Sequence, residues 1–272
     1  MRTYTDKNAD FLILTETKID PASMAKKIKM NGLEASVFSL SPHARAGVVI
    51  YSQRKHRIRE HSTRTSREPG YFAMAVYNMA GEAVVVVGIY GKPENNDLAS
   101  ASLLEEMEQA IQELQHLYGA RNVIIAGDFN VTRHIDDASS GTVHKPRAAQ
   151  KLNSLIDTLN LQDLDEEFMQ PVAPRHTWYK PNDPNCSSRL DYILTSFPIV
   201  ELQVELTPSI YDHEQLKAAF GHSRRHGPMT MRDTVLAKDE FTIRAMENIQ
   251  CMLLALSQEH GHLSKAEIES MA

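Results

Sequence analysis

The sequence is poor in cysteine and lacks long apolar runs. Only two of its 272 residues are cysteines, Cys186 and Cys251, which excludes a disulfide framework or a cysteine-rich zinc cluster. No stretch approaches the roughly 18 apolar residues that a membrane span needs, and neither an internal repeat nor a low-complexity tract is present. We therefore expect an intracellular globular protein, nuclear or cytoplasmic, without membrane association.

An excess of positive charge is also lacking. The formal net charge is −6 at pH 7, which excludes a protein held to nucleic acid by bulk positive charge alone. It is compatible with a carboxylate site that binds a divalent cation. Basic residues gather in two short segments, which we interpret as solvated surface loops rather than as patches that follow phosphates. They are Arg54, Lys55, Arg57, Arg59, Arg64 and Arg67, and then Arg224 and Arg225.

Short apolar runs bounded by turn residues predict buried strands. The predicted strands cover residues 11–14, 47–51, 73–77, 83–90, 122–126 and 190–194. Residues 97–118 and 146–160 carry leucine and isoleucine at helical spacing and predict two helices. Because some strands follow one another directly and others alternate with helices, the pattern favours an α/β layered fold with mixed sheets.

The composition changes near residue 220. Residues 222–228 are basic and polar and end in Gly227-Pro228, which is typical of a linker. Residues 238–256 and 264–271 then predict two helices. We expect a domain over residues 1–220 and a linker with a helical C-terminal tail over residues 221–272.

Gly127-Asp128-Phe129-Asn130 directly follows a predicted strand. A glycine lets the chain turn tightly there, and alternation along the strand end places Asp128 and Asn130 on the same side. Such a pair could orient a water molecule and hold a phosphate oxygen. It could equally be a strand-ending Asx turn.

Three further polar positions invite a functional and a structural interpretation. Glu16 ends a strand and could give one oxygen to Mg²⁺, or be a surface glutamate. Asp191 lies inside an apolar strand and needs a partner, which could be a histidine that it orients or Arg189 in an ion pair. Asp212 and His213 are adjacent and could supply an acid and an imidazole, or be a surface pair.

Taken in order, these motifs form a recognisable series. Glu16, Tyr90, Gly127-Asp128-Phe129-Asn130, Arg189-Leu190-Asp191-Tyr192 and Asp212-His213 together resemble the exonuclease-endonuclease-phosphatase superfamily. Thr177-Trp178 and Ser188-Arg189-Leu190-Asp191-Tyr192 resemble the endonucleases of non-LTR (LINE-type) retrotransposons. Parts of residues 227–249 are similar to the segment that joins such an endonuclease to a reverse transcriptase.

The resemblance implies a DNase I-like fold, a four-layered α/β sandwich of two mixed β-sheets flanked by helices. It spans nearly all of residues 9–250. It begins after the first strand of the superfamily, which ends in an asparagine of the metal site. We therefore expect an N-terminally truncated domain with one open sheet edge.

The resemblance also implies an activity, a metal-dependent endonuclease that hydrolyses phosphodiester bonds. The implied partner is DNA rather than RNA, with a reverse transcriptase module in a longer parent protein, and the implied cofactor is Mg²⁺, with Mn²⁺ as the alternative. The implied catalytic residues are Tyr90, Asp128, Asn130, Asp191 and His213, the metal ligands Glu16 and Asp212, and the substrate contacts Thr177, Trp178 and Arg189. The alternative is a catalytically impaired remnant that binds nucleic acid or protein.

Overall fold

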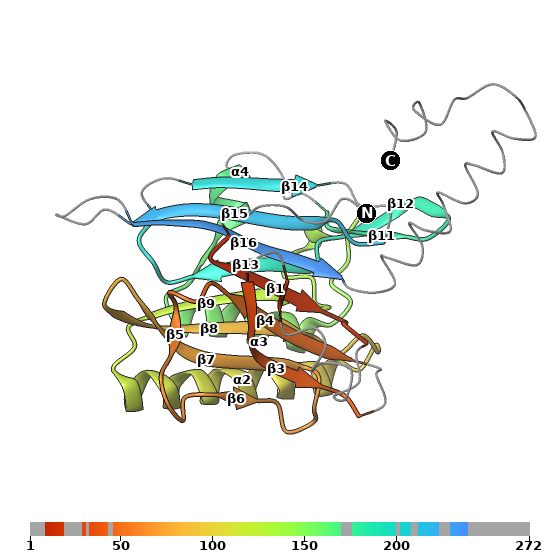
Figure 1. The fold of residues 1–272 in the computed structure, drawn as a ribbon. Coiled ribbons are helices and arrows are strands. Elements are labelled where there is room, and N and C mark those ends of the chain that lie inside the picture. Colours follow the sequence, from red (N-terminus) through yellow and green to blue (C-terminus); the bar gives the residue numbers. More distant parts are fainter. Residues whose placement is uncertain are drawn as a thin grey trace, which may run out of the picture.

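The computed structural model describes residues 9–18, 29–30, 33–42, 46–169, 176–199, 202–207, 212–222 and 229–238. Two β-sheets lie face to face, and helices cover the outer face of one of them (Figure 1). The arrangement agrees with the expected sandwich of two mixed sheets. In the part of the chain that the structure describes, no helix is both long and apolar enough to cross a membrane.

The first sheet has the order β14-β15-β16-β1-β4-β3-β2. Its strands are β1 (Phe11–Thr15), β2 (Lys29–Met30), β3 (Leu33–Leu40), β4 (Gly47–Ser52), β14 (Leu202–Thr207), β15 (Gln215–His222) and β16 (Met229–Lys238). β1 pairs antiparallel with β4 and parallel with β16. All five residues of β1 are buried, as expected of a continuous apolar run inside a sandwich.

The second sheet has the order β10-β13-β9-β8-β7-β5, and β6 also pairs with β7. Its strands are β5 (Arg57–Ile58), β6 (Arg64–Thr65), β7 (Phe72–Met79), β8 (Glu82–Tyr90), β9 (Asn122–Asp128), β10 (Gln162–Asp163) and β13 (Asp191–Thr195). A separate hairpin joins β11 (Trp178–Lys180) to β12 (Asp183–Ser188). β8 and β9 are parallel, and the helix between them makes the crossover that parallel strands need.

The main core lies between the two sheets. A Cβ atom on Gly88 of β8 would come within 2.7 Å of Val48 and 3.0 Å of Ile13, so the sheets approach each other closely at this glycine. α2 (Asp97–Tyr118) and α3 (Pro146–Thr158) pack on the outer face of the second sheet and bury most of the apolar side chains predicted for them, whereas Leu117 near the end of α2 is exposed. η1 (Ile135–Asp137) and α4 (Leu164–Met169) complete the described helices.

The C-terminal region differs from its prediction. The expected boundary at residue 220 falls inside β15, and β16 lies between β15 and β1 as a strand of the first sheet. The edge of β1 that the resemblance left open is thus paired in this structure. Of the linker predicted at residues 222–228, His222 is the last residue of β15 and the remainder lies outside the described residues, apart from Lys238 and the helices considered next. The helices predicted at residues 238–256 and 264–271 also lie outside them, apart from Lys238 at the end of β16.

Candidate active site

Several strands end at the same place and bring the polar motifs together. The register pairs Asp128 of β9 with Tyr90 of β8 on one side and with Asp191 of β13 on the other. An isolated bridge between Trp178 and His213 brings the histidine to the same end. Residues far apart in the sequence therefore lie close together, since the register of neighbouring strands places them opposite one another.

Asp128 and Asn130 lie on the same side of the strand end, as predicted. The Asn130 amide donates to the Asp128 carboxylate at 3.0 Å, and the Asn130 backbone N–H donates to it at 2.9 Å. The second contact is the Asx turn of the structural interpretation, and it is compatible with the functional one. Asn130 adopts φ 51°, a left-handed conformation that such a turn tolerates.

Gly127 serves a different purpose from the predicted tight turn, because it still belongs to β9. A Cβ atom there would lie 1.9 Å from the Ile89 carbonyl oxygen, which excludes any side chain. Gly91, just after β8, has the same constraint, since its Cβ atom would meet the Phe129 carbonyl oxygen at 1.8 Å. These two glycines let the ends of β8 and β9 approach closely enough to share a site.

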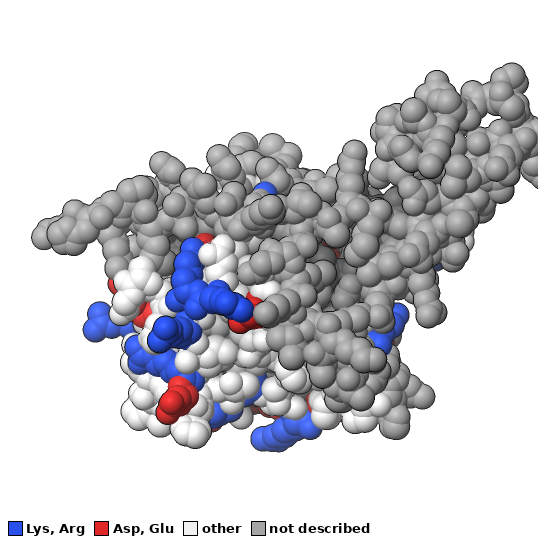
Figure 2. All heavy atoms as spheres, viewed as in Figure 1, with Lys and Arg blue, Asp and Glu red and all other residues white. Residues whose placement is uncertain are grey.

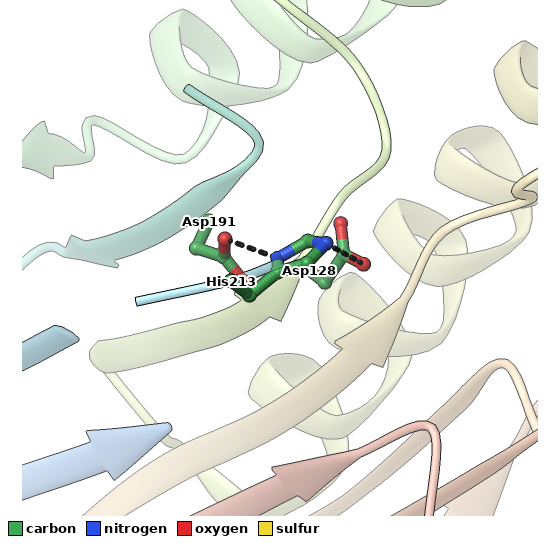
Figure 3. Close-up of side chains that lie close together, drawn as sticks. All are labelled: Asp128, Asp191 and His213. Carbon is green, nitrogen blue, oxygen red and sulfur yellow. Dashed lines mark hydrogen bonds and ion pairs between the residues drawn. The ribbon is translucent and has the colours of Figure 1, made fainter. Parts of the chain in front are cut away.

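Asp191 finds a histidine as its partner. The His213 Nδ1 atom lies 2.8 Å from the Asp191 carboxylate, and Nε2 lies 3.9 Å from the Asp128 carboxylate. Figure 3 shows the imidazole between the two acids. A carboxylate at Nδ1 stabilises the tautomer or the imidazolium that carries a proton there. All three side chains are largely buried, so the geometry is fixed by packing.

Glu16 and Tyr90 form the opposite wall. The Tyr90 hydroxyl donates to the Glu16 carboxylate at 3.3 Å, and Lys18 Nζ lies 3.2 Å from the same oxygen. Burial, and next the carboxylates of Glu16 and Asp128, raise the pKa of Tyr90 well above its usual value, so the phenol remains a neutral donor. Glu16 adopts φ 51°, and left-handed backbone at a non-glycine residue is typical of sites under functional constraint.

A cavity of about 490 Å³ opens between these walls. Its lining includes Glu16, Tyr90, Pro93, Asn95, Asp128, Asn130, Thr132, Ser139, Ser140, His144, Lys145, Trp178, Cys186, Ser187, Ser188, Asp212 and His213. The polar side chains converge on one concave space, which is the arrangement of a small-molecule or phosphate site.

Thr177, Trp178 and Asp212 frame the His213 side of the cavity. The Thr177 hydroxyl accepts hydrogen bonds from the backbone N–H groups of Leu190 and Asp191, so it fixes the start of β13. Trp178 is half-buried in the cavity wall, and its Nε1 atom donates to the Asp212 carboxylate at 3.3 Å. Thr177 thus acts through the backbone of Asp191, while Trp178 and Asp212 reach the cavity.

Arg189 does not lie where the resemblance implied. Its side chain is fully buried and outside the cavity, among the carboxylates of Asp137, Asp163 and Glu166. Burial acts to lower the pKa of Arg189, but nearby carboxylates, Asp163 foremost and also Asp137 and Asp165, hold it above its usual value. The expectation of a substrate contact is therefore wrong for this structure, because a sealed guanidinium cannot reach a ligand.

The donor atoms in the cavity suit a divalent cation. Asp128, Asp191 and His213 offer ligand atoms that all lie within 4.8 Å of one another, and Glu16 adds a carboxylate on the facing wall. Oxygen-rich sets of this kind match the preference of Mg²⁺ and Mn²⁺.

The basic segment after β4 lies away from the cavity. Ser52 at the end of β4 pairs with Phe11 at the start of β1, whereas Glu16 follows the other end of β1. Figure 2 shows lysine and arginine atoms gathered on this side of the molecule. Arg54 contacts Glu34 and Lys55 contacts Asp10, so the interpretation as a solvated, paired surface agrees with the structure.

Sequence reasoning missed the cavity residues between Thr132 and Lys145. They lie in the connection between β9 and α3, which carries no periodic pattern. Lys145 is an isolated lysine before Pro146, and only the proline, which is common at the first position of a helix, marks the segment. No local signal could have assigned it to the site.

Comparison with known proteins agrees with this geometry. The family model described as "Endonuclease/Exonuclease/phosphatase family" matches residues 1–209, and the chain belongs to this family. No curated protein matches the chain. The superfamily resemblance is thereby confirmed, while the retrotransposon branch stays a prediction.

Solved structures share the fold at low sequence identity. A 3'-5' exonuclease (NExo) from Neisseria meningitidis is 18% identical with a TM-score of 0.57, over 78% of this chain and 89% of its own. An AP endonuclease from Archaeoglobus fulgidus is 18% identical with a TM-score of 0.56, over 78% and 88%. An AP endonuclease from Leishmania major is 16% identical with a TM-score of 0.59, over 82% and 78%. The expected fold class is confirmed.

Proposed function

We propose that this protein is a divalent-metal-dependent phosphodiesterase that cleaves DNA, an endonuclease of the retrotransposon type. The observation that carries the proposal is the Asp191–His213–Asp128 arrangement, with Asn130 on the same carboxylate and a cavity in front of it. Family membership and three structural relatives whose names describe nucleases support it.

Asp128 is the group that activates the attacking water. The Asn130 amide fixes one carboxylate oxygen, so the carboxylate keeps one orientation. A positioned base of this kind contributes roughly 10²–10⁴-fold to a hydrolysis rate. The water attacks phosphorus as its proton passes to Asp128, the P–O bond to the leaving nucleotide breaks, and the leaving oxygen takes up a proton from solvent, so no protein side chain has to form a covalent intermediate.

His213 stabilises charge on the phosphate. Asp191 holds the proton on Nδ1, and the protonated imidazole then presents Nε2–H toward the side of the cavity where Asp128 lies. Charge that develops on phosphate oxygens during the attack is stabilised by such a preorganised donor. Tyr90, kept protonated, lies on the opposite wall, where its hydroxyl donates to Glu16.

Glu16 and Asp128 are the residues that would hold the cation, and Asp212 lies at the edge of the same cavity. When bound, Mg²⁺ supplies Lewis-acid stabilisation of the phosphate charge. Lys18 and Tyr90 both contact the same oxygen of the Glu16 carboxylate. These contacts support its assignment as a group that attracts positive charge. Mn²⁺ prefers similar ligands and is expected to substitute.

Trp178 and the cavity size favour a nucleic acid as substrate. The half-buried indole offers a face on which a nucleobase can stack, and such stacking is worth roughly 1–3 kcal/mol. The net charge of −6 means that affinity has to come from local contacts rather than from bulk charge. A reverse transcriptase module in a longer parent protein stays a prediction.

The test is a nicking assay on supercoiled plasmid with Mg²⁺, run on the wild type and on Asp128→Ala and His213→Ala. We expect metal-dependent nicking that EDTA abolishes and that each substitution lowers by roughly 10²–10⁴-fold. Nicking that survives both substitutions would contradict the residue roles. A folded wild type that binds DNA without nicking it would instead favour a non-catalytic binding module.

A further inference from the structure

Lys145 is the single lysine or arginine that lines the cavity in the described part of the chain. The walls also carry the carboxylates of Glu16, Asp128 and Asp212. A phosphodiester brings one negative charge into a space that is already acidic. A positively charged side chain at this position therefore stabilises a bound phosphodiester most effectively.

The fold holds Lys145 at the cavity wall. It is the last residue before α3, and its side chain takes no part in capping that helix. The residue is only 6% exposed, and Nζ donates to the main-chain oxygen of Lys92, two residues beyond Tyr90. An ammonium has three N–H donors, so this contact leaves two for a bound group.

Carboxylates surround the Lys145 ammonium. Burial lowers the pKa of Lys145, and the carboxylates of Asp128, Glu94 and Asp97, which act to raise it, offset only part of that shift. Asp97 accepts hydrogen bonds from the first backbone N–H groups of α3, from Arg147 at 3.0 Å and from Ala148 at 2.8 Å. Asp97 is thus engaged by the helix, whereas Asp128 shares the cavity with Lys145.

This inference rests on the proposed function and refines its site. We propose that Lys145 is a phosphate-binding residue of the cavity, whose ammonium contacts a non-bridging oxygen of the phosphodiester held beside Asp128. Lysine is a common phosphate ligand because it acts as a compact point charge with several donors. Its contact offsets the repulsion that the three carboxylates exert on the substrate.

The test compares Lys145→Met and Lys145→Arg with the wild type. Plasmid nicking in Mg²⁺ gives the rate, and fluorescence anisotropy of a short labelled DNA duplex, with Ca²⁺ in place of Mg²⁺, gives the affinity. We expect Lys145→Met to weaken binding and to lower kcat/KM, each by roughly tenfold to a hundredfold. The slope of log affinity against log salt should fall by about 0.9, as one phosphate contact is lost. Lys145→Arg should retain most of the slope.

Arg147→Met is the matched control. Arg147 is exposed, lies two residues away at the start of the same helix and does not line the cavity, yet its loss changes the net charge equally. We expect it to bind and cleave DNA like the wild type. An equal loss of affinity in Arg147→Met and Lys145→Met would overturn the proposal, because it would show a general charge effect.

Other outcomes are equally decisive. If Lys145→Met lowers the melting temperature but leaves the salt slope and kcat/KM unchanged, Lys145 only ties α3 to Lys92 and the proposal fails. If the wild type nicks DNA and Lys145→Met does so equally well, this inference fails while the proposed function stands. If the wild type neither binds nor nicks DNA, both fail together.

Discussion

Two clusters of buried charge lie near the ends of β9 and β13, and they differ in what the charges face. The site cluster consists of Asp128, Asp191 and His213, of which Asp128 and His213 line a cavity. The arginine cluster, Arg133, Asp137, Asp163, Glu166 and Arg189, joins β10, α4 and the segment before β13, and Arg189 is fully sealed within it.

The difference distinguishes buried charges that we expect to stabilise the fold from buried charges that we expect to take part in the reaction. In the arginine cluster each guanidinium meets carboxylates directly, with Arg133 2.7 Å from Asp163 and Arg189 3.2 Å from Glu166. In the site cluster the carboxylates of Asp128 and Asp191 contact an amide and an imidazole, and Asp128 lines the cavity. Buried charges that pair with one another are therefore expected to stabilise the fold. Carboxylates beside a cavity are expected to bind a cation and to take part in catalysis.

The largest effect is expected from a substitution in the arginine cluster. Arg189→Met leaves the carboxylates of Asp137 and Asp163 buried without their guanidinium, which should lower the free energy of unfolding by about 3–5 kcal/mol. Urea denaturation measures it. The control is Arg64→Met, which removes a surface pair with Glu113 and should cost about 0–1 kcal/mol. Equal stability of the two variants would erase the distinction between the clusters.

The next largest effect is expected from a substitution in the site cluster. Asp191→Asn keeps the shape of the side chain but no longer requires the proton on His213 Nδ1. We expect kcat/KM to fall by roughly 10²–10³-fold with little change in the unfolding midpoint, measured on the same nicking substrate. Full activity would show that His213 does not depend on Asp191. A loss of stability as large as that of Arg189→Met would mean that both clusters are structural.

A smaller effect is expected at Tyr90. Tyr90→Phe removes the donor to Glu16 while the ring still stacks on Tyr71, 6.2 Å between centroids. The rate should fall roughly tenfold. Because the pKa of Tyr90 is raised by burial and by nearby carboxylates, the wild-type pH–rate profile should show no loss of activity from tyrosine ionisation up to about pH 10. A basic limb that disappears in Tyr90→Phe would contradict this assignment.

The smallest effect concerns Asp10, a buried acid outside both clusters. Burial acts to raise the pKa of Asp10, but hydrogen bonds from His56 and Lys55 outweigh it and lower the pKa below 3.8. A lowered folded-state pKa adds stability above the unfolded value, and that stability is lost as the pH falls through the folded value. Asp10→Asn should therefore cost about 1 kcal/mol at neutral pH and less below about pH 4, measured by urea denaturation. A difference that is independent of pH would contradict the ion-pair explanation.

The regular elements of the second sheet could be predicted from the sequence, because the apolar pattern of each element indicates which of its residues are buried. The 97–118 helix matches α2, and the run at residues 83–90 matches β8 to within one residue. β3 was missed because Ser36 and Ser39 interrupt its apolar pattern, and the structure shows why they are tolerated. Ser36 donates to the Ile50 carbonyl oxygen and contacts the Tyr77 hydroxyl, and Ser39 accepts from the Gly70 N–H.

The motifs of the site could be found in the sequence, but their partners could not. Asp128 and Asn130 are two residues apart, so strand geometry alone predicted their proximity. Whether Asp191 would pair with Arg189 or with a histidine depended on which side of the strand faced the cavity. Lys145 entered the site only because α3 begins beside the loop after β8.

By itself the sequence determined the α/β class, the strand ends that carry acids and the resemblance to a family, since these depend on local periodicity and on residues close together in the chain. Only the tertiary structure decided that Asp191 orients His213, that Arg189 is sealed away from the cavity and that β16 pairs with β1. Those outcomes depend on strand register and order, which arise from long-range pairing that no short segment encodes.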